Sequence, residues 1–317
     1  PPYSVPGIGA VALVPLLVSQ LRKRYTRAES FRAGYLFGCT FFILLLWWIK
    51  DLLPWANVTI PWLMTPALIV AVLYLALYPA FFCLLLRVIS GGRRVTALVI
   101  APALWVLLEL LRSRGEIGFP WGVAGYSVAG YPRMIQTASL VGVYGLSFFV
   151  LAVNSLFASA LLSRGFVRRT VPAAAGIAVI ALNGAIGGRL MSGSDDRADR
   201  ETVTIAIIQP NINLEIKWNP SHTDSIFGVY ERLCRTVRPF EPELYIFPET
   251  AAPVYINFEP RYRQRIVRLV RELDAPVFIG YLDARRDARN GEMNIYNAAG
   301  LFARDGRLAA QYEKVHL

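Results

Sequence analysis

The chain has 317 residues, of which 55% are hydrophobic and 17% are charged, and its mean hydropathy is +0.42. A soluble globular protein has about 25% charged residues, so this composition argues against an ordinary cytosolic protein and against a disordered chain. Three cysteines are too few for a disulfide framework. The net charge of +11 is uneven: residues 1–190 carry 16 Lys or Arg against 4 Asp or Glu, whereas residues 191–317 carry 17 against 18. The basic excess therefore belongs to the apolar part of the chain, which favours a membrane over a nucleic acid as its partner.

The first 190 residues predict a membrane domain. Six stretches are nearly uncharged and are close in length to the roughly 20 apolar residues that a membrane-spanning helix needs. They are Pro1–Leu21, Ala33–Ile49, Leu63–Leu86, Val95–Leu111, Met134–Ser163 and Thr170–Gly188. Together they leave too little polar surface for a soluble domain. We therefore expect about six transmembrane helices over residues 1–190, followed by a polar linker over residues 191–200.

The loops between these stretches predict the orientation in the membrane. Three basic loops alternate with loops that hold fewer positive charges. The basic loops contain Arg22, Lys23, Arg24 and Arg27, then Arg87, Arg93 and Arg94, and then Arg164, Arg168 and Arg169. The positive-inside rule places these loops in the cytoplasm, so everything after about residue 190 is expected on the outer face.

Two of the outer loops are rich in aromatic residues. The first contains Trp47, Trp48, Trp55 and Trp62, and the second contains Trp121 and Tyr126. Such residues are typical of the aromatic belt at the lipid headgroups, and they could equally form the wall of a site for an acyl chain. Glu109 falls within a predicted span, where a carboxylate is costly. A functional role is one interpretation; the others are that it extends towards the membrane surface or pairs with Arg112.

Residues 201–317 predict an α/β domain with a mixed sheet, because strand and helix patterns alternate before a final hairpin. The predicted strands are Thr202–Ile208, which reads as buried, Leu244–Phe247, Pro276–Gly280, Ile295–Ala303 and Leu308–Val315. The last two flank Asp305-Gly306, a strong hairpin-turn signal. Ser221 and Asp224 predict a capping box for a helix that runs to about Arg238, and a second, amphipathic helix is expected over Arg261–Leu273.

Two charged residues of this domain are candidates for chemistry. Glu249 follows a strand that Pro248 ends, and strand ends are where α/β domains carry their sites. Lys314 lies on the last predicted strand, on the same face as Tyr312 and His316. A lysine on a largely buried strand needs a partner, and Glu249 is the obvious one. A purely structural ion pair is the alternative interpretation.

Cysteine and metal chemistry have weaker support. Cys39 and Cys83 fall within predicted spans, and Cys234 falls on a helix with no base at a usable spacing. The sequence contains no recognisable zinc or nucleotide motif, and we expect neither a metal nor a cofactor.

The order of these motifs resembles a known family. Phe247-Pro248-Glu249-Thr250, followed downstream by Tyr312-Glu313-Lys314-Val315-His316-Leu317, is similar to the pattern of the nitrilase (carbon–nitrogen hydrolase) superfamily. Combined with a multi-span N-terminal domain, it resembles the bacterial apolipoprotein N-acyltransferase family. The other similar segments are Pro102-Ala103-Leu104-Trp105 with Glu109, Gly118-Phe119-Pro120-Trp121, Gly125-Tyr126-Ser127, Gln209-Pro210-Asn211, Lys217-Trp218 and Tyr296-Asn297.

The resemblance implies a fold and a location. It implies a polytopic α-helical membrane domain followed by part of a nitrilase-like α/β domain, of the α-β-β-α sandwich type, over residues 201–317. It also implies a multi-pass protein of the bacterial inner membrane with the nitrilase-like domain on the periplasmic face. The implied partners are a phospholipid acyl donor, the diacylated N-terminus of an apolipoprotein and membrane lipids, with no nucleic acid.

The resemblance also implies a reaction. A cysteine takes an acyl chain from a phospholipid as a thioester, and the α-amine of the diacylglyceryl-cysteine of the apolipoprotein then takes it over. Glu249 corresponds to the general base and Lys314 to the group that stabilises the oxyanion. Trp218 corresponds to a tryptophan at the substrate entrance and Asn297 to a supporting asparagine. Trp121 and Tyr126 are expected to contact substrate.

The family's nucleophilic cysteine is expected some tens of residues after Lys314. The chain begins at Pro1 without a methionine and stops at Leu317, so we expect a fragment that lacks both ends and is inactive by itself. Two alternatives remain open. One is a membrane-anchored nitrilase-type amidase, in which water replaces the lipopeptide amine. The other is a non-catalytic, truncated homologue.

Overall fold

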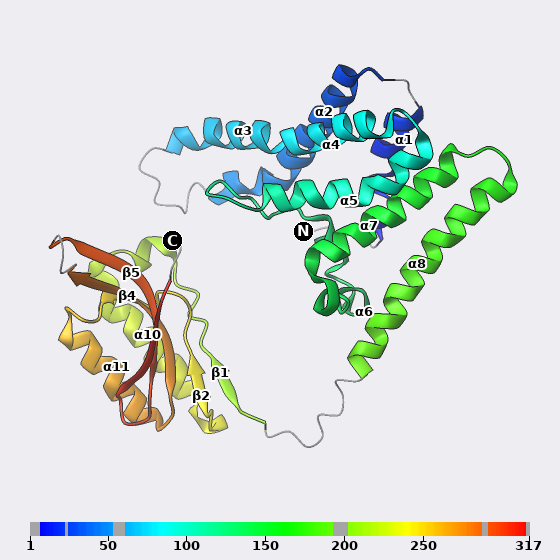
Figure 1. The fold of residues 1–317 in the computed structure, drawn as a ribbon. Helices are drawn as coiled ribbons and strands as arrows, with labels where there is room; N and C mark the ends of the chain where they lie inside the picture. The colour runs from blue at the N-terminus through cyan, green and yellow to red at the C-terminus, as the bar shows by residue number, and fades with distance from the viewer. Residues whose placement is uncertain (1–6, 23–24, 53–60, 193–201, 287–290, 315–317) are drawn as a thin grey trace. The chain divides into compact units, whose positions relative to one another are not determined.

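The computed structural model describes residues 7–22, 25–52, 61–192, 202–286 and 291–314 (Figure 1). They form two compact units, which are described here one at a time. The helical unit runs through Ser192, and the α/β unit begins at Thr202. The predicted 191–200 linker lies almost entirely outside the described residues, apart from Met191 and Ser192 at the end of the last helix.

The helical unit is built from long apolar helices. Its α-helices are α1 (Val14–Arg22), α2 (Arg27–Leu46), α3 (Met64–Leu75), α4 (Leu77–Ser90), α5 (Arg94–Arg112), α6 (Pro132–Ile135), α7 (Ala138–Leu162) and α8 (Phe166–Ser192). Short 3-10 turns occupy Ile8–Ala10, Trp47–Leu52, Pro61–Leu63 and Ala124–Val128. Five helical segments in the described part of the chain are long and apolar enough to cross a membrane: Arg27–Lys50, Met64–Ser90, Arg94–Arg112, Ala138–Leu162 and Phe166–Ser192.

The described residues thus contain five segments of spanning length, against the about six spans that the sequence predicts for residues 1–190. The first apolar stretch gives only a shorter segment, Ile8–Arg22, and residues 1–6 of that stretch lie outside the description. Gly7 has a φ of 75°, which ends helical geometry at that point. Asn154 on α7 then holds the segment: its Oδ1 accepts from the Leu13 N–H at 2.9 Å, and its Nδ2 donates to the Gly9 carbonyl at 2.8 Å.

Small residues allow close helix packing within this unit. A Cβ atom on Gly34 of α2 would lie 2.4 Å from the Pro79 carbonyl oxygen of α4, and one on Gly38 would lie 2.8 Å from the Ala76 Cα. Helices in a membrane associate through such close contacts, because lipid provides no hydrophobic driving force between them. The two helices therefore require glycine at these positions.

The α/β unit is a six-stranded mixed sheet with helices on one face (Figure 1). Its strands are β1 (Ile205–Ile207), β2 (Leu244–Ile246), β3 (Ala252–Tyr255), β4 (Val277–Arg286), β5 (Met293–Phe302) and β6 (Leu308–Glu313). Its α-helices are α9 (Leu214–Lys217), α10 (Thr223–Val237) and α11 (Pro260–Leu273). The strand order is β1-β2-β4-β5-β6, with β3 paired to β4. Strands β1, β2 and β4 are parallel, whereas β4, β5 and β6 are successively antiparallel.

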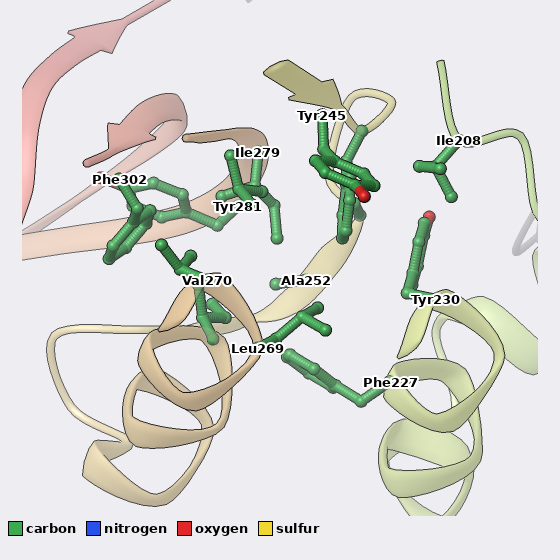
Figure 2. Close-up of a cluster of buried hydrophobic side chains, with 14 of the residues drawn as sticks. Ile208, Phe227, Tyr230, Tyr245, Ala252, Leu269, Val270, Ile279, Tyr281 and Phe302 are labelled. Carbon is green, nitrogen blue, oxygen red and sulfur yellow. The ribbon is translucent and has the colours of Figure 1, made fainter. Parts of the chain in front are cut away.

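One face of the sheet packs on α10 and α11. Figure 2 shows Phe227 and Tyr230 from α10 with Leu269 and Val270 from α11 meeting side chains from the strands, and the strand side of this core is formed by Tyr245, Ile279, Tyr281 and Phe302. On α11 the buried positions Ile266, Leu269, Val270 and Leu273 recur at helical spacing. That spacing is the amphipathic pattern that predicted the helix, and the predicted order of strands and helices is confirmed.

The opposite face of the sheet carries exposed apolar side chains. Ile207 is 77% exposed, and Ile205, Phe278 and Tyr312 are also exposed. The prediction of a buried strand over Thr202–Ile208 is therefore wrong in extent and in burial. The strand has three residues, and only Ala206 of these packs on the core that the described helices cover.

Two further details of the α/β unit differ from the sequence prediction. The Ser221–Asp224 capping box does not form: Asn219 accepts from the Ser221 N–H, and Asp224 pairs instead with Arg261 and Arg265 of α11. Strand β3 was not predicted. It is four residues long, contains a proline, and runs parallel to β4.

Candidate active site

Glu249 lies just beyond the end of β2. The Phe247 N–H still donates to the Phe278 carbonyl of β4 at 2.8 Å, and Pro248 then ends the ladder because it has no N–H to donate. Thr250 follows with a φ of 50°, so the chain turns sharply after the glutamate. The turn is pressed against Gly280 of β4, where a Cβ atom would lie 2.6 Å from the Thr250 nitrogen. Glycine at 280 is what lets the Glu249 backbone approach the sheet this closely.

Lys314 directly follows β6, and Asn297 of β5 connects it to Glu249. The Lys314 Nζ donates to the Glu249 Oε1 at 3.4 Å, so the predicted pairing of these two residues is confirmed. The Lys314 N–H donates to the Asn297 carbonyl at 2.9 Å. The Asn297 side-chain amide donates to the same oxygen of Glu249. Asn297 thus holds Lys314 through its main chain and Glu249 through its side chain.

These donors change the acidity of Glu249. The hydrogen bond from Asn297, and then the hydrogen bond and positive charge of Lys314, lower the pKa of the Glu249 carboxyl below its usual value. The side chains of Glu249 and Lys314 are 66% and 50% exposed, so water screens much of their attraction. Glu249 is consequently an ionised carboxylate at neutral pH, held in place more by geometry than by a strong ion pair.

Lys217 is a member of this cluster that the sequence analysis did not identify. It ends α9, and its Nζ donates to the backbone carbonyl of Glu249 at 3.1 Å. The ammonium also lies 5.6 Å from the ring centre of Trp218. Partial burial lowers the pKa of Lys217, and the charge of Glu249 opposes that shift. The Lys217-Trp218 motif was noted for its tryptophan, and a contact to a backbone carbonyl 32 residues away has no sequence signal.

A cavity of about 300 Å³ opens beside the charge pair. It is lined by Phe247, Pro248, Glu249, Phe278, Gly280, Asn297, Ala298, Ala299, Tyr312 and Lys314. Most of this lining is apolar, and the carboxylate and the ammonium are its charged groups. Such a pocket can hold a neutral carbonyl compound between a proton acceptor and a positive charge.

The other predicted site residues, Trp218, Trp121 and Tyr126, do not line the cavity beside Glu249. Trp218 is 45% exposed, beside Lys217. Trp121 stacks on Trp48 with ring centres 5.4 Å apart, and Tyr126 is 51% exposed. Both of the latter belong to the helical unit, so the geometry of the α/β unit does not test their predicted role. His316 lies outside the described residues.

Glu109 neither extends to the surface nor forms an ion pair with Arg112 in the described part of the chain. It is buried, and its Oε1 accepts from the Trp105 indole N–H at 2.7 Å and from the Ala124 N–H at 2.8 Å. It therefore fastens the 3-10 turn at Ala124–Val128 to α5. The expectation of a surface position is wrong, and the charge of Glu109 acts on Arg112 without forming a direct ion pair, because the hydrogen-bond partners of Glu109 are an indole on its own helix and a backbone amide in a loop.

The cysteines are unsuited to nucleophilic attack where they stand. Cys234 on α10 is fully buried, and burial raises the pKa of its thiol to about 12. Cys39 and Cys83 lie on α2 and α4 of the helical unit. Among the described residues no group of three or more His, Cys, Asp or Glu could hold a metal ion.

The mixed sheet, with a glutamate at a strand end and a lysine after the hairpin, defines a nitrilase-type domain that follows a set of membrane helices in the sequence. A family model described as "Carbon-nitrogen hydrolase" matches residues 204–317, and one described as "Apolipoprotein N-acyltransferase N-terminal domain" matches residues 1–156. Relatives that carry the name apolipoprotein N-acyltransferase include three bacterial proteins. The protein from Geobacter metallireducens is 33% identical over 99% of this chain, the one from Brucella suis 28% over 100%, and the one from Chromobacterium violaceum 32% over 78%.

The chain is therefore a homologue of the apolipoprotein N-acyltransferases, a multi-pass membrane protein whose α/β unit is part of a nitrilase-like domain. The matched regions cover 60%, 61% and 47% of the length of these three relatives. The chain thus spans less than two thirds of them.

Proposed function

We propose that the full-length protein transfers an acyl chain from a phospholipid to the α-amine of the diacylglyceryl-cysteine of an apolipoprotein. The observation that carries this proposal is the cluster of Glu249, Lys314 and Asn297 beside a largely apolar cavity. Homology to proteins named apolipoprotein N-acyltransferase supports the choice of reaction and substrates.

Glu249 is the proposed general base. It takes the proton of a cysteine thiol, and the thiolate attacks the ester carbonyl of the phospholipid. The ester C–O bond breaks, the lysophospholipid oxygen takes the proton from Glu249, and a thioester remains. Glu249 then takes a proton from the lipoprotein amine as that amine attacks the thioester and the thiolate leaves. The lowered pKa keeps the Glu249 carboxylate ionised at neutral pH, as a proton acceptor must be, but it also makes this carboxylate a weaker base.

Lys314 is the proposed stabiliser of the oxyanions in both steps. Its ammonium lies on the cavity wall 3.4 Å from Glu249, so a carbonyl that reacts beside the base meets a positive charge. The proposed nucleophile is a cysteine after Lys314 in the full-length protein, because Cys234 is buried and protonated and the other two cysteines lie on membrane helices. A chain of residues 1–317 alone is expected to be inactive.

The proposed location of the α/β unit is the periplasmic face of the inner membrane. The basic loops before α2, between α4 and α5, and between α7 and α8 all fall on one side of five alternating spans. The positive-inside rule assigns that side to the cytoplasm, so the end of α8 is periplasmic. Trp218, Trp121 and Tyr126 are proposed to contact the lipid or lipopeptide.

The test is an acyl-transfer assay with the full-length protein in detergent, a diacylated lipopeptide and a radiolabelled phospholipid. We expect transfer by the wild type, and a loss of at least about a hundredfold in Glu249→Gln and in Lys314→Met. Glu215→Gln, on the short helix α9, is the matched control and should retain activity.

Two outcomes would reject the proposal. Lipid-independent release of ammonia from small amides would favour the amidase alternative. Absence of turnover with either substrate, with Glu249→Gln indistinguishable from wild type in lipopeptide binding, would favour the non-catalytic homologue.

A further inference from the structure

A strongly basic cavity lies within the helical unit, where α1 ends, α5 begins and α7 connects to α8. Its volume is about 690 Å³. Five of the eleven residues that line it are arginines: Arg22, Arg94, Arg164, Arg168 and Arg169. The described lining includes no acidic residue. Residues that are far apart in sequence therefore bring five positive charges to one hollow.

Two of the five arginines are held by backbone carbonyls, and within the described residues none of the five forms an ion pair with a carboxylate. The Arg94 Nε donates to the Leu21 carbonyl at 3.3 Å, and the Arg169 Nε donates to the Ser163 carbonyl at 2.9 Å. These bonds use one N–H of each five-donor guanidinium group and leave the outer N–H groups for another acceptor. Gathering five like charges at one place raises the local potential, which an anion in the cavity would relieve.

An apolar groove continues directly from this cavity. It has a volume of about 340 Å³ and shares Val95, Leu98 and Ser159 with the basic cavity. From there it runs between α5 and α7, and its remaining lining residues are Val99, Pro102, Phe148, Ala152, Ser155 and Leu156. The distance from Val95 to Pro102 along α5 is about 10 Å at 1.5 Å per residue. A headgroup-sized basic hollow thus opens into a channel long enough for part of an acyl chain.

We propose that these two cavities bind one anionic phospholipid, with its phosphate in the arginine cavity and an acyl chain in the groove. Guanidinium groups favour phosphate oxygens because they bind them in a bidentate manner, and a basic pocket between membrane helices on the cytoplasmic side suits an anionic headgroup. The continuous groove favours a lipid over a free anion. By the proposed orientation this site faces the inner leaflet, so its occupant is a bound lipid distinct from the acyl donor at the periplasmic side.

Binding can be measured independently of catalysis. The full-length protein, purified in a neutral detergent, is titrated with dioleoyl phosphatidylglycerol or dioleoyl phosphatidylcholine, and bound lipid is counted by native mass spectrometry. We expect selective retention of phosphatidylglycerol, and about tenfold weaker binding in the double variant Arg164→Gln/Arg168→Gln, because each arginine contributes to attraction of an anionic lipid. Arg93→Gln, at the same end of the bundle but outside the cavity lining, should bind like the wild type.

Two further experiments distinguish the binding of a lipid from the binding of a free anion. Ala152→Phe places a bulky side chain in the groove and should weaken phosphatidylglycerol binding without changing the arginines. Val99→Phe, at an exposed position on the wall of the same groove, serves if Ala152→Phe lowers the yield of folded protein. Inorganic phosphate at millimolar concentration should compete weakly.

Three results would overturn the proposal: equal retention of the two lipids, an equal loss in Arg93→Gln, or lipid binding that is indifferent to groove filling but fully displaced by phosphate. None of them depends on acyl transfer, so a failure here is distinguishable from a failure of the proposed function.

Discussion

The side-chain ammonium of Lys217 donates to the main-chain carbonyl of Glu249, the residue whose side chain pairs with Lys314. The proposed base is therefore held from two directions, by Lys217 at its backbone and by Asn297 and Lys314 at its carboxylate. Because Lys217 is followed by Trp218, the same contact fixes the start of the segment that carries the exposed indole.

Lys217→Met should lower the kcat of acyl transfer by about tenfold. It removes a hydrogen bond from a charged donor, which contributes about 1.5–3 kcal/mol, while the aliphatic stem stays. Lys217 is a positioning residue, so the acid limb of the pH profile should move little. An unchanged kcat in steady-state assays would contradict the role, and Glu215→Gln on α9 is the control.

Gly280→Ala should destabilise the protein by about 1–3 kcal/mol and reduce acyl transfer. A Cβ atom there would lie 2.6 Å from the Thr250 nitrogen and 2.8 Å from the Pro248 carbonyl, and backbone atoms cannot move aside as a flexible side chain can. Gly228→Ala is a matched control on α10, where the nearest atom is an arginine nitrogen at 3.8 Å. It should raise stability slightly, because alanine favours a helix. Thermal unfolding should therefore shift in opposite directions for the two variants.

Asn297→Ala should move the acid limb of kcat/KM to higher pH. The hydrogen bond from Asn297 is the largest cause of the lowered pKa of Glu249. Its removal raises that pKa, so Glu249 becomes protonated, and inactive as a base, at a higher pH than in the wild type. Asn294→Ala, at an exposed position on the same strand, should leave the profile unchanged. An unshifted limb in Asn297→Ala would show that another group titrates.

Asp283→Ala should cost about 3 kcal/mol of stability. Asp283 on β4 is fully buried and accepts from the Ala284 N–H at 2.9 Å, from the Gln311 side chain at 2.7 Å and from Asn257. Alanine would leave the buried Ala284 N–H without an acceptor and would remove the bonds from the exposed residues Gln311 and Asn257. Asp305→Ala, in the exposed hairpin turn, should cost less than about 1 kcal/mol. Similar melting temperatures for the two variants would contradict this account.

The parts of the fold and site that could be predicted have local signals. The α11 helix follows from its apolar spacing, the hairpin from Asp305-Gly306, and the place of Glu249 from the rule that strand ends carry sites. The pairing of Lys314 with Glu249 was predicted from a largely buried strand, whereas Lys314 follows an exposed strand and its side chain is half exposed. The incorrect predictions concern residues whose contacts depend on a partner that is distant in the sequence. Asp224 pairs with Arg261 and Arg265 instead of capping its own helix. The burial of Ile207 depends on which face of the sheet is covered.

Asn297 binds Lys314 through its main chain and Glu249 through its side chain, so the geometry of the site depends on the register of the β5–β6 hairpin. Inserting one residue between Ala303 and Arg307 without a compensating bulge would shift the pairing of Ala298 with Glu313 and turn alternate side chains to the other face. Lys314 and the Asn297 amide would then no longer converge on Glu249. Insertions of an odd number of residues in this turn should therefore be tolerated less well than insertions of an even number, although the turn itself touches none of the three residues.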